Sequence, residues 1–322
     1  MSSFEAVVNF RYNSFRHLSS EALMQKIKPY LAISYTLVFW GISFISTKIC
    51  LQAFSVYALI FGRFAIAAII LFLVKRKLEP EQRLLKKDLP RVLIAGLIGF
   101  TGYYVFEAVG VDLTGASMAS ILLSLVPIFC MLIDTVILKR RFTFIKAGAV
   151  AFSVVGVIMI VGLSKIEINP WGCGAMILSG HGWLLYNYLA KPLYSRYTGL
   201  DITTYLSACI AGVTLPLAFA FPPDFSLFTG EIIINFLFLA VLVSATANLT
   251  YMYALRSIPI LTVTILVNFV PVVTIVFSAL VLGETFTALQ LLGAALVIAS
   301  VCLTALPEKP SGNSEDEIEP EG

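Results

Sequence analysis

The sequence predicts an all-α membrane protein with ten transmembrane helices, arranged as an inverted repeat of two five-helix halves. Of its 322 residues, 59% are hydrophobic and 13% are charged, and the mean hydropathy is +0.92. Soluble domains carry about 25% charged residues. Apolar runs of about 20 residues, the length that spans a bilayer as a helix, recur from residue 30 to residue 306. The two halves of this region also resemble each other.

The expected membrane helices are bounded by proline, glycine or charged residues. They cover residues 30–50, 55–74, 91–111, 115–137, 146–163, 171–190, 202–221, 231–254, 260–282 and 287–306. Arg63 in the second helix costs about 3 kcal/mol at the bilayer centre, whereas each Leu, Ile, Phe or Val returns about 0.3 to 0.6 kcal/mol. The apolar residues around Arg63 are numerous enough for this helix to insert.

The two ends of the chain are polar. Residues 1–29 form a cytoplasmic N-terminal segment, and the first helix is expected to begin after Pro29. Met24 and the basic residues after it are typical of a chain start, so residues 1–23 are interpreted as an upstream extension of the gene model. The tail, residues 307–322, combines proline, glycine, serine and acidic residues and is expected to be disordered in the cytoplasm.

The positions of lysine and arginine predict the orientation in a cell membrane. Short cytoplasmic loops are enriched in these residues. With both termini in the cytoplasm, the outer loops hold only Lys165, and the inner loops hold Lys75, Arg76, Lys77, Arg83, Lys86, Lys87, Arg91, Lys139, Arg140, Arg141, Lys146, Lys191, Arg196 and Arg256. This asymmetry favours cytoplasmic termini.

An internal repeat divides the chain into two similar halves, residues 30–163 and residues 171–306. When the sequence is aligned with itself, residues 121–127 match residues 265–271, including their prolines. A register shorter by one position pairs Trp40 with Trp183 and Lys48 with Lys191. Because each half contains five helices, the second half enters the membrane in the opposite sense. Inverted repeats are typical of alternating-access transporters, which expose one central cavity to each side in turn.

On these residues the sequence resembles the drug/metabolite transporter superfamily, and specifically its EamA-type branch. The resemblance covers about residues 30–306 and is carried by Phe-Trp-Gly-Ile-Ser-Phe at 39–44 with Lys48, Arg63, Ala116-Ser117, Leu-Val-Pro at 125–127, Phe-Val-Pro at 269–271 and Leu-Gly-Glu at 282–284. It implies ten helices, cytoplasmic termini, and export or exchange of amino acids, other metabolites or drugs. Residues 139–141 depart from the family's Gly-Glu, so that glutamate is present only as Glu284.

Glu107 is the leading candidate for a transport site, because ionisable groups inside a membrane are costly and are often functional. Tyr103 and Glu107 share one face of the third helix, at i and i+4. Alternatively, Glu107 is a structural partner of Arg63 or lies near the outer interface. Arg63 is suited to binding a substrate carboxylate or to bonding carbonyls that lock the helices.

Three further groups have two interpretations each. Asp134 is a proton-relay candidate or the partner of Lys139 or Arg140. Lys48 is a candidate substrate or gate residue or a structural charge, whereas Lys191 is expected to be an anchor at the membrane interface. Aromatic and amide side chains on the sixth and eighth helices indicate a binding face or ordinary helix packing. The expected cavity is lined by Trp40, Tyr103, Glu107, Trp183, Tyr186, Asn187, Asn248 and Tyr251.

Two prolines mark expected hinges. Pro127 and Pro271 occupy matching positions in the two halves, and a proline inside a helix removes one backbone hydrogen bond. The freed carbonyls and the paired kinks predict hinges beside the cavity.

These patterns predict a secondary transporter, and not an enzyme, that exports or exchanges small metabolites such as amino acids, or amphipathic drugs. A proton or solute gradient supplies the energy, because no nucleotide-binding loop is present. The alternatives are a sugar-phosphate or nucleotide-sugar exchanger of the same fold, and a receptor or lipid-handling protein that does not transport. The sequence suggests no cofactor, metal or nucleic-acid partner, and the five cysteines are interpreted as buried apolar residues. The expected partners are the transported solute and the lipid bilayer, and the sequence is compatible with both a monomer and a homodimer.

Overall fold

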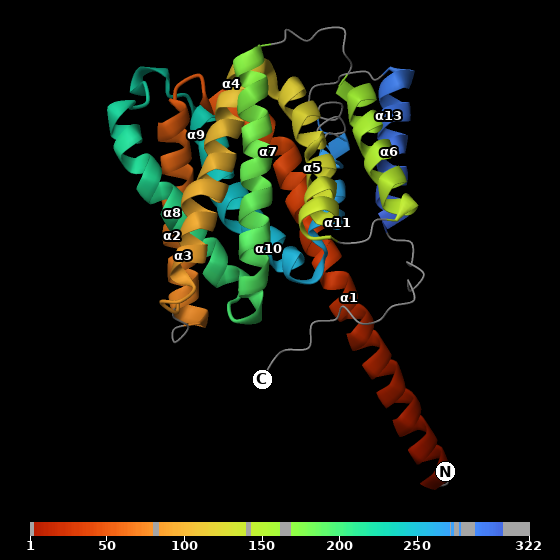
Figure 1. Ribbon diagram of the computed structural model, residues 1–322. Coiled ribbons are helices and arrows are strands. Elements are labelled where there is room, and N and C mark those ends of the chain that lie inside the picture. Colours follow the sequence, from red (N-terminus) through yellow and green to blue (C-terminus); the bar gives the residue numbers. More distant parts are fainter. Residues whose placement is uncertain are drawn as a thin grey trace.

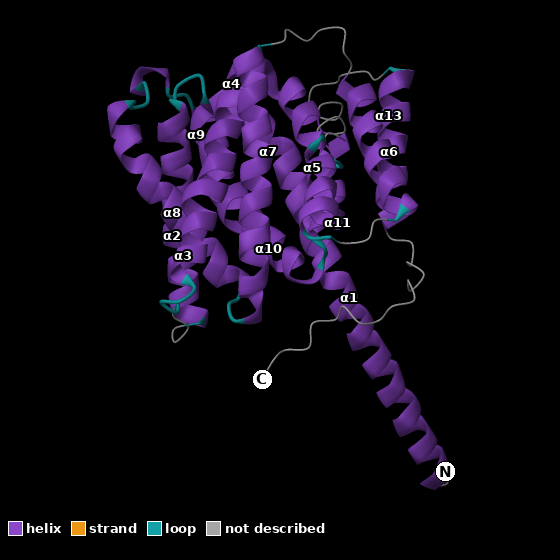
Figure 2. Ribbon diagram, viewed as in Figure 1, coloured by secondary structure: helices purple, strands orange, loops and turns teal. Residues whose placement is uncertain are grey.

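The computed structural model describes residues 3–79, 84–139, 143–161, 169–270, 272–273, 277 and 287–304, and these residues form helices and loops without a strand (Figure 2). The helices form one bundle (Figure 1). They are α1 (Ser3–Cys50), α2 (Val56–Leu78), α3 (Leu89–Leu93), α4 (Thr101–Ser124), α5 (Val126–Leu132), α6 (Phe144–Val161), α7 (Pro170–Ala190), α8 (Gly199–Ala220), α9 (Gly230–Leu237), α10 (Asn248–Ser257), α11 (Ile260–Val267) and α13 (Ala288–Thr304).

Several of these helices are long and apolar enough to cross a bilayer. Within the described ranges, five meet this condition, at Ile27–Cys50, Val56–Leu78, Leu89–Thr114, Gly199–Ala220 and Gly230–Ser257. Shorter apolar helices cover Val126–Ile137, Phe144–Met159 and Leu291–Ser300. The apolar side chains that these helices expose, such as Phe72 and Phe219, are compatible with lipid as the solvent.

Two helix boundaries differ from those expected. The first helix begins at Ser3 and continues through Pro29, and its N-terminal part projects from the bundle (Figure 1). The third and fourth predicted helices are joined, because α4 continues through residues 112–114. No proline interrupts this stretch, and the Thr114 hydroxyl bonds to the Gly110 carbonyl at 2.7 Å, a contact that bends helices while they continue.

Elements in the two halves begin at matching positions of the internal repeat. In the register that pairs the two tryptophans, the start of α2 coincides with the start of α8. In the register that pairs the two prolines, the start of α6 coincides with that of α13, and the π-helical segment Ile94–Phe100 begins where Phe238–Ala247 begins. Both π-helical segments precede the helices that carry Glu107 and Tyr251. Each has i→i+5 hydrogen bonds, an arrangement that is frequent at functional sites.

Polar contacts join the ends of α2, α3 and α8 at one end of the bundle. Lys75 pairs with the fully buried Asp201. The guanidinium of Arg196 donates to both carboxylate oxygens of Asp88, at 2.8 and 3.0 Å, and the Tyr197 hydroxyl donates to Asp88 at 2.9 Å. These contacts fix the loop before α3 to the loop between α7 and α8.

We expect the contacts of Asp88 to make stability depend on pH. Desolvation alone would raise the pKa of Asp88, but the bonds from Arg196 and Tyr197 lower it below its usual value. Stabilisation is therefore present above the unfolded-state pKa of about 3.9 and is lost as the pH falls through the lower folded-state pKa. Asp88→Asn should lower the melting temperature at neutral pH, and the difference from wild type should vanish in acid. A pH-independent difference would contradict this account, and Glu231→Gln, on an exposed residue, serves as the control.

Candidate functional site

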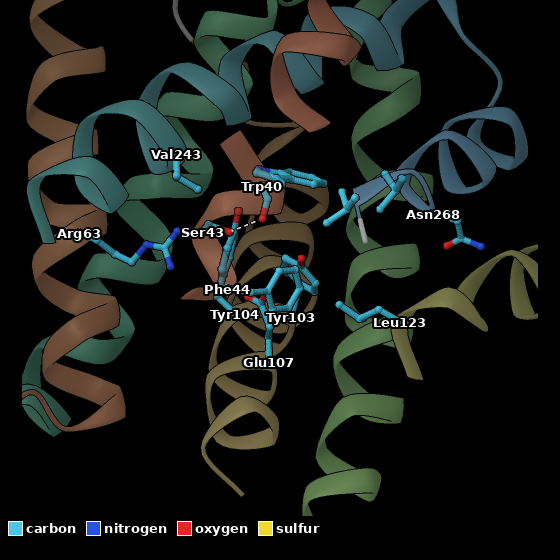
Figure 3. A pocket seen from close by; sticks show the side chains of 12 residues that line it. Trp40, Ser43, Phe44, Arg63, Tyr103, Tyr104, Glu107, Leu123, Val243 and Asn268 are labelled. Carbon is cyan, nitrogen blue, oxygen red and sulfur yellow. Dashed lines mark hydrogen bonds between the residues drawn. The ribbon is translucent and has the colours of Figure 1, made fainter. Parts of the chain in front are cut away.

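A cavity lies between the two halves of the chain, where α1, α2 and α4 meet the π-helical segment before α10 and the end of α11 (Figure 3). Its volume available to water-sized molecules is about 30 Å³. A water molecule needs about 10 to 15 Å³ on this measure, so the cavity admits about two waters. The residues that line it are Trp40, Ser43, Phe44, Arg63, Tyr103, Tyr104, Glu107, Leu123, Val243, Val267, Asn268 and Val270.

Arg63 supplies the positive charge of the cavity. It extends from α2 and is only 3% exposed. Its Nε donates to the Ser244 hydroxyl at 2.7 Å, and its guanidinium carbon lies 5.3 Å from the ring centres of both Phe64 and Tyr104. The aromatic rings favour the cation electrostatically. One edge of the guanidinium is thus anchored to the second half of the chain while the group faces the cavity.

Glu107 supplies the negative charge. It lies on α4, one turn after Tyr103, is half-buried and lines the same cavity as Arg63 (Figure 3). Within the described residues, Arg63 and Glu107 are the charged side chains that line it, and no ion pair joins them there. The cavity therefore presents separate positive and negative groups, which suits a ligand that carries both charges.

Trp40 gives the cavity an apolar wall and one unpaired donor. Its ring stacks on Tyr251, with 5.0 Å between centroids. The side chain is 6% exposed, and its Nε1 has no hydrogen-bond partner in the described part of the chain. An unpaired buried donor costs about 1 to 3 kcal/mol. A water or a ligand acceptor at this position would remove that cost.

Five predicted cavity residues lie beside the cavity instead of lining it. They form a buried layer in which the Tyr251 hydroxyl donates to Asn187 at 3.0 Å and the Tyr104 hydroxyl donates to Asn248 at 2.8 Å. The ring of Trp183 lies 5.8 Å from that of Tyr251. The members of this layer are Trp183, Tyr186, Asn187, Asn248 and Tyr251, each at most 3% exposed.

The sequence predicts Trp40, Tyr103 and Glu107 as cavity residues, and the structure brings these three together with Arg63. Tyr104, Ser43 and Asn268 also line the cavity, although the sequence pattern does not predict them there. Tyr104 is the neighbour of Tyr103 in sequence and would face elsewhere on a narrow helical stripe. Ser43 donates to the Trp40 carbonyl at 2.8 Å, which turns it toward the same wall.

The remaining candidates lie outside the cavity. Asp134 accepts a hydrogen bond from Tyr188 at 2.8 Å, and Lys48 lies 3.9 Å from Asp112 with both side chains about half exposed. Pro127 is near the start of α5, directly after the chain leaves α4 at Leu125. Pro271 lies outside the described residues.

Comparison with known proteins gives consistent results. A model of the EamA-like transporter family matches residues 27–162 and again residues 170–306. An uncharacterized transporter of Archaeoglobus fulgidus is 27% identical, over 85% of this chain and 98% of its own length. A probable terminal-alkyne amino-acid exporter of Streptantibioticus cattleyicolor is 29% identical, over 87% and 94%. One crystal structure superposes with a TM-score of 0.73 over 87% of this chain and 98% of that chain, at 15% identity, and so shares the fold.

Proposed function

Because the chain belongs to the EamA-like transporter family, we propose that it is a secondary transporter that exports or exchanges small organic metabolites such as amino acids. The observation that carries this proposal is the cavity with one guanidinium, one carboxyl and aromatic walls. Arg63 suits a substrate carboxylate, and Glu107 suits a substrate ammonium. Trp40 and Phe44 offer an apolar surface to the rest of the solute.

The proposed mechanism is alternating access, because the cavity admits only about two waters. An amino acid enters only when the halves move apart. The break between α4 and α5 at Leu125, next to Pro127, is the proposed hinge on one side, and Pro271 is its proposed counterpart. A gradient of protons or of solute would drive the cycle, with Glu107 as the group that exchanges a proton.

The proposed topology has ten membrane helices in two inverted halves, residues 30–163 and 171–306, with both termini in the cytoplasm. The matching positions of the helix starts support the repeat. Basic residues at the end of α2 (Lys75), in the loop before α3 (Lys86 and Lys87) and in the loop after α7 (Arg196) belong to the end of the bundle that holds Asp88. Since cytoplasmic loops are rich in lysine and arginine, this end is assigned to the cytoplasm.

A sugar-phosphate exchanger is less compatible with the cavity. Phosphate groups are commonly held by several cationic or bidentate donors. Arg63 is the cationic side chain among the described lining residues. The zwitterionic substrate is therefore preferred.

The test is flux in liposomes that contain the purified protein. Labelled apolar and aromatic amino acids should leave these vesicles faster than protein-free vesicles, and a pH gradient should change the rate. Acidic amino acids and sugar phosphates should move more slowly. Absence of flux for every neutral amino acid, with a protein that is monodisperse and folded, would contradict the proposed function.

A further inference from the structure

The two lysines that the internal repeat pairs make the same kind of contact, at opposite ends of the bundle. The ammonium of Lys48 donates to the carbonyl of Asp112, and the ammonium of Lys191 donates to the carbonyl of Leu255. Each lysine lies 64 residues before its acceptor. The repeat therefore pairs the two acceptors in the same register as the two lysines. The same contact thus occurs once in each half of the chain.

The two contacts differ in strength. Lys191 is partly buried and donates to the carbonyls of both Leu255 and Ile258, each at 2.7 Å. Lys48 reaches the Asp112 carbonyl at 3.4 Å, and its side chain and that of Asp112 are 50% and 53% exposed. Hydrogen bonds from charged donors weaken with length and exposure to water. One end of the bundle is therefore held firmly and the other end loosely.

The position of the cavity agrees with this difference. Phe44, which lines the cavity, is one helical turn before Lys48, and Glu107 is five residues before Asp112. The loose contact thus lies next to the cavity. On the side of Lys191, Tyr251 is fully buried and the Tyr194 hydroxyl lies 2.8 Å from the Met252 sulfur, and Lys191 itself lines a separate, open surface pocket of about 530 Å³.

We propose that Lys48 and Lys191 are paired latches of the transport cycle, each of which closes one side of the membrane while the other is open. This inference rests on the proposed alternating-access function. In an inverted repeat, the two halves exchange conformations between the outward-open and inward-open states. When Lys191 releases its two carbonyls, Lys48 shortens its bond to Asp112 and takes up a second carbonyl about one turn further along α4.

A structural role alone would have a different signature. In a purely structural role, the ammonium of Lys191 would stabilise α10 by binding the carbonyl groups at the C-terminal end of that helix and by interacting with the helix dipole. Loss of such a bond would loosen the region around it and leave the opposite side of the membrane unchanged. A latch couples the two sides of the membrane. When a substitution destabilises the state that is closed on one side, the population shifts toward the state that is closed on the other side.

Hydrogen exchange with mass spectrometry on the full-length protein in lipid nanodiscs separates these roles. Lys191→Met should accelerate exchange in residues 251–260 and slow it in residues 107–114, each by about tenfold, which is the scale of one charge-assisted hydrogen bond. Lys48→Met should produce the opposite changes in the same two segments. Lys191→Arg keeps the donors and should restore the wild-type pattern, and Lys86→Met, on an exposed loop residue, is the matched control.

Reciprocal changes would support the latches, whereas changes confined to the mutated end, or no change at either end, would overturn them. If the Lys191→Met protein fails to fold, the reciprocal prediction is tested with Lys48→Met, because the contact of Lys48 is exposed and loose. The flux assay is separate. Reciprocal exchange without amino-acid flux would retain the latches and reject the proposed substrate, and flux without reciprocal exchange would do the reverse.

Discussion

Replacing Glu107 with glutamine is expected to reduce amino-acid flux by about 10 to 100 fold. A hydrogen bond to a charged group is worth about 1.5 to 3 kcal/mol, and the neutral amide no longer attracts an ammonium group. The groups that face Glu107 are Arg63, Tyr103 and Tyr104. Glu107 is the carboxyl among these groups, and it is the group expected to set the pH dependence. The measurement is the initial rate of efflux from proteoliposomes at a series of pH values.

The control for this experiment is Glu231→Gln, which makes the same chemical change on an exposed residue of the first turn of α9. It should keep the wild-type rate and the wild-type pH profile. Glu107→Gln should transport more slowly than wild type and lose the wild-type pH profile, without a change in melting temperature or elution volume. If it transports like wild type at every pH, Glu107 is a structural residue and the proposed site is wrong.

Adding one methyl group at Gly182 is expected to destabilise the bundle severely. A Cβ at this position would lie 2.9 Å from the Gly99 carbonyl oxygen and 2.9 Å from the Tyr103 backbone nitrogen. Backbone atoms cannot rotate away as a side chain can, so α7 must move away from α4 and the segment before it. Overpacking costs about 1 to 3 kcal/mol, and occasionally more. The displacement would also reach Tyr103 in the cavity.

The matched control is Gly174→Ala, because Gly174 lies on the same helix and a Cβ there meets nothing within 4 Å. Fluorescence-detected thermal unfolding of the two variants in detergent should give a much lower melting temperature for Gly182→Ala and a value near wild type for Gly174→Ala. Alanine also has the higher helix propensity. Equal melting temperatures would show that the two helices are not as close as the structure places them.

Much of this architecture can be predicted from the sequence because the bilayer requires long apolar helices. The spacing of four residues places Tyr103 and Glu107 on one helix face, and both line the cavity. The family and the transporter class also follow from residues that carry the resemblance, such as Trp40 and Arg63. These features depend on composition, spacing and local motifs, which can be read without tertiary contacts.

The depth of a side chain in the bundle cannot be predicted in this way. Helical spacing places Trp183 and Asn187 on an inward face, but it does not distinguish a cavity wall from the packed layer behind it. The width of the stripe adds a further difficulty. Tyr104 is one residue after Tyr103 and so about 100° around the helix, and a stripe drawn through Tyr103 and Glu107 alone misses it.

The boundaries that differ have a similar cause. Pro29 is expected to precede a helix because it lacks a backbone donor, yet α1 continues through it. Only one hydrogen bond is lost there, and the surrounding residues contain no second helix breaker. At residues 112–114 the polar composition suggests a loop, whereas the helical hydrogen bonds of α4 continue. Composition therefore predicts which segments are apolar better than it predicts where each helix ends.

The central claim, that one cavity between the halves opens to each side of the membrane in turn, has a direct test that needs no knowledge of the substrate. Ser43 lines the cavity, and Ser43→Cys is a small change. Membrane-impermeant maleimide would be added to right-side-out and to inside-out vesicles, and peptide mass spectrometry would measure alkylation at residue 43 alone. We predict alkylation from both sides, with Lys191→Met raising it from the cytoplasmic side. Alkylation from one side only, under every condition, would contradict alternating access.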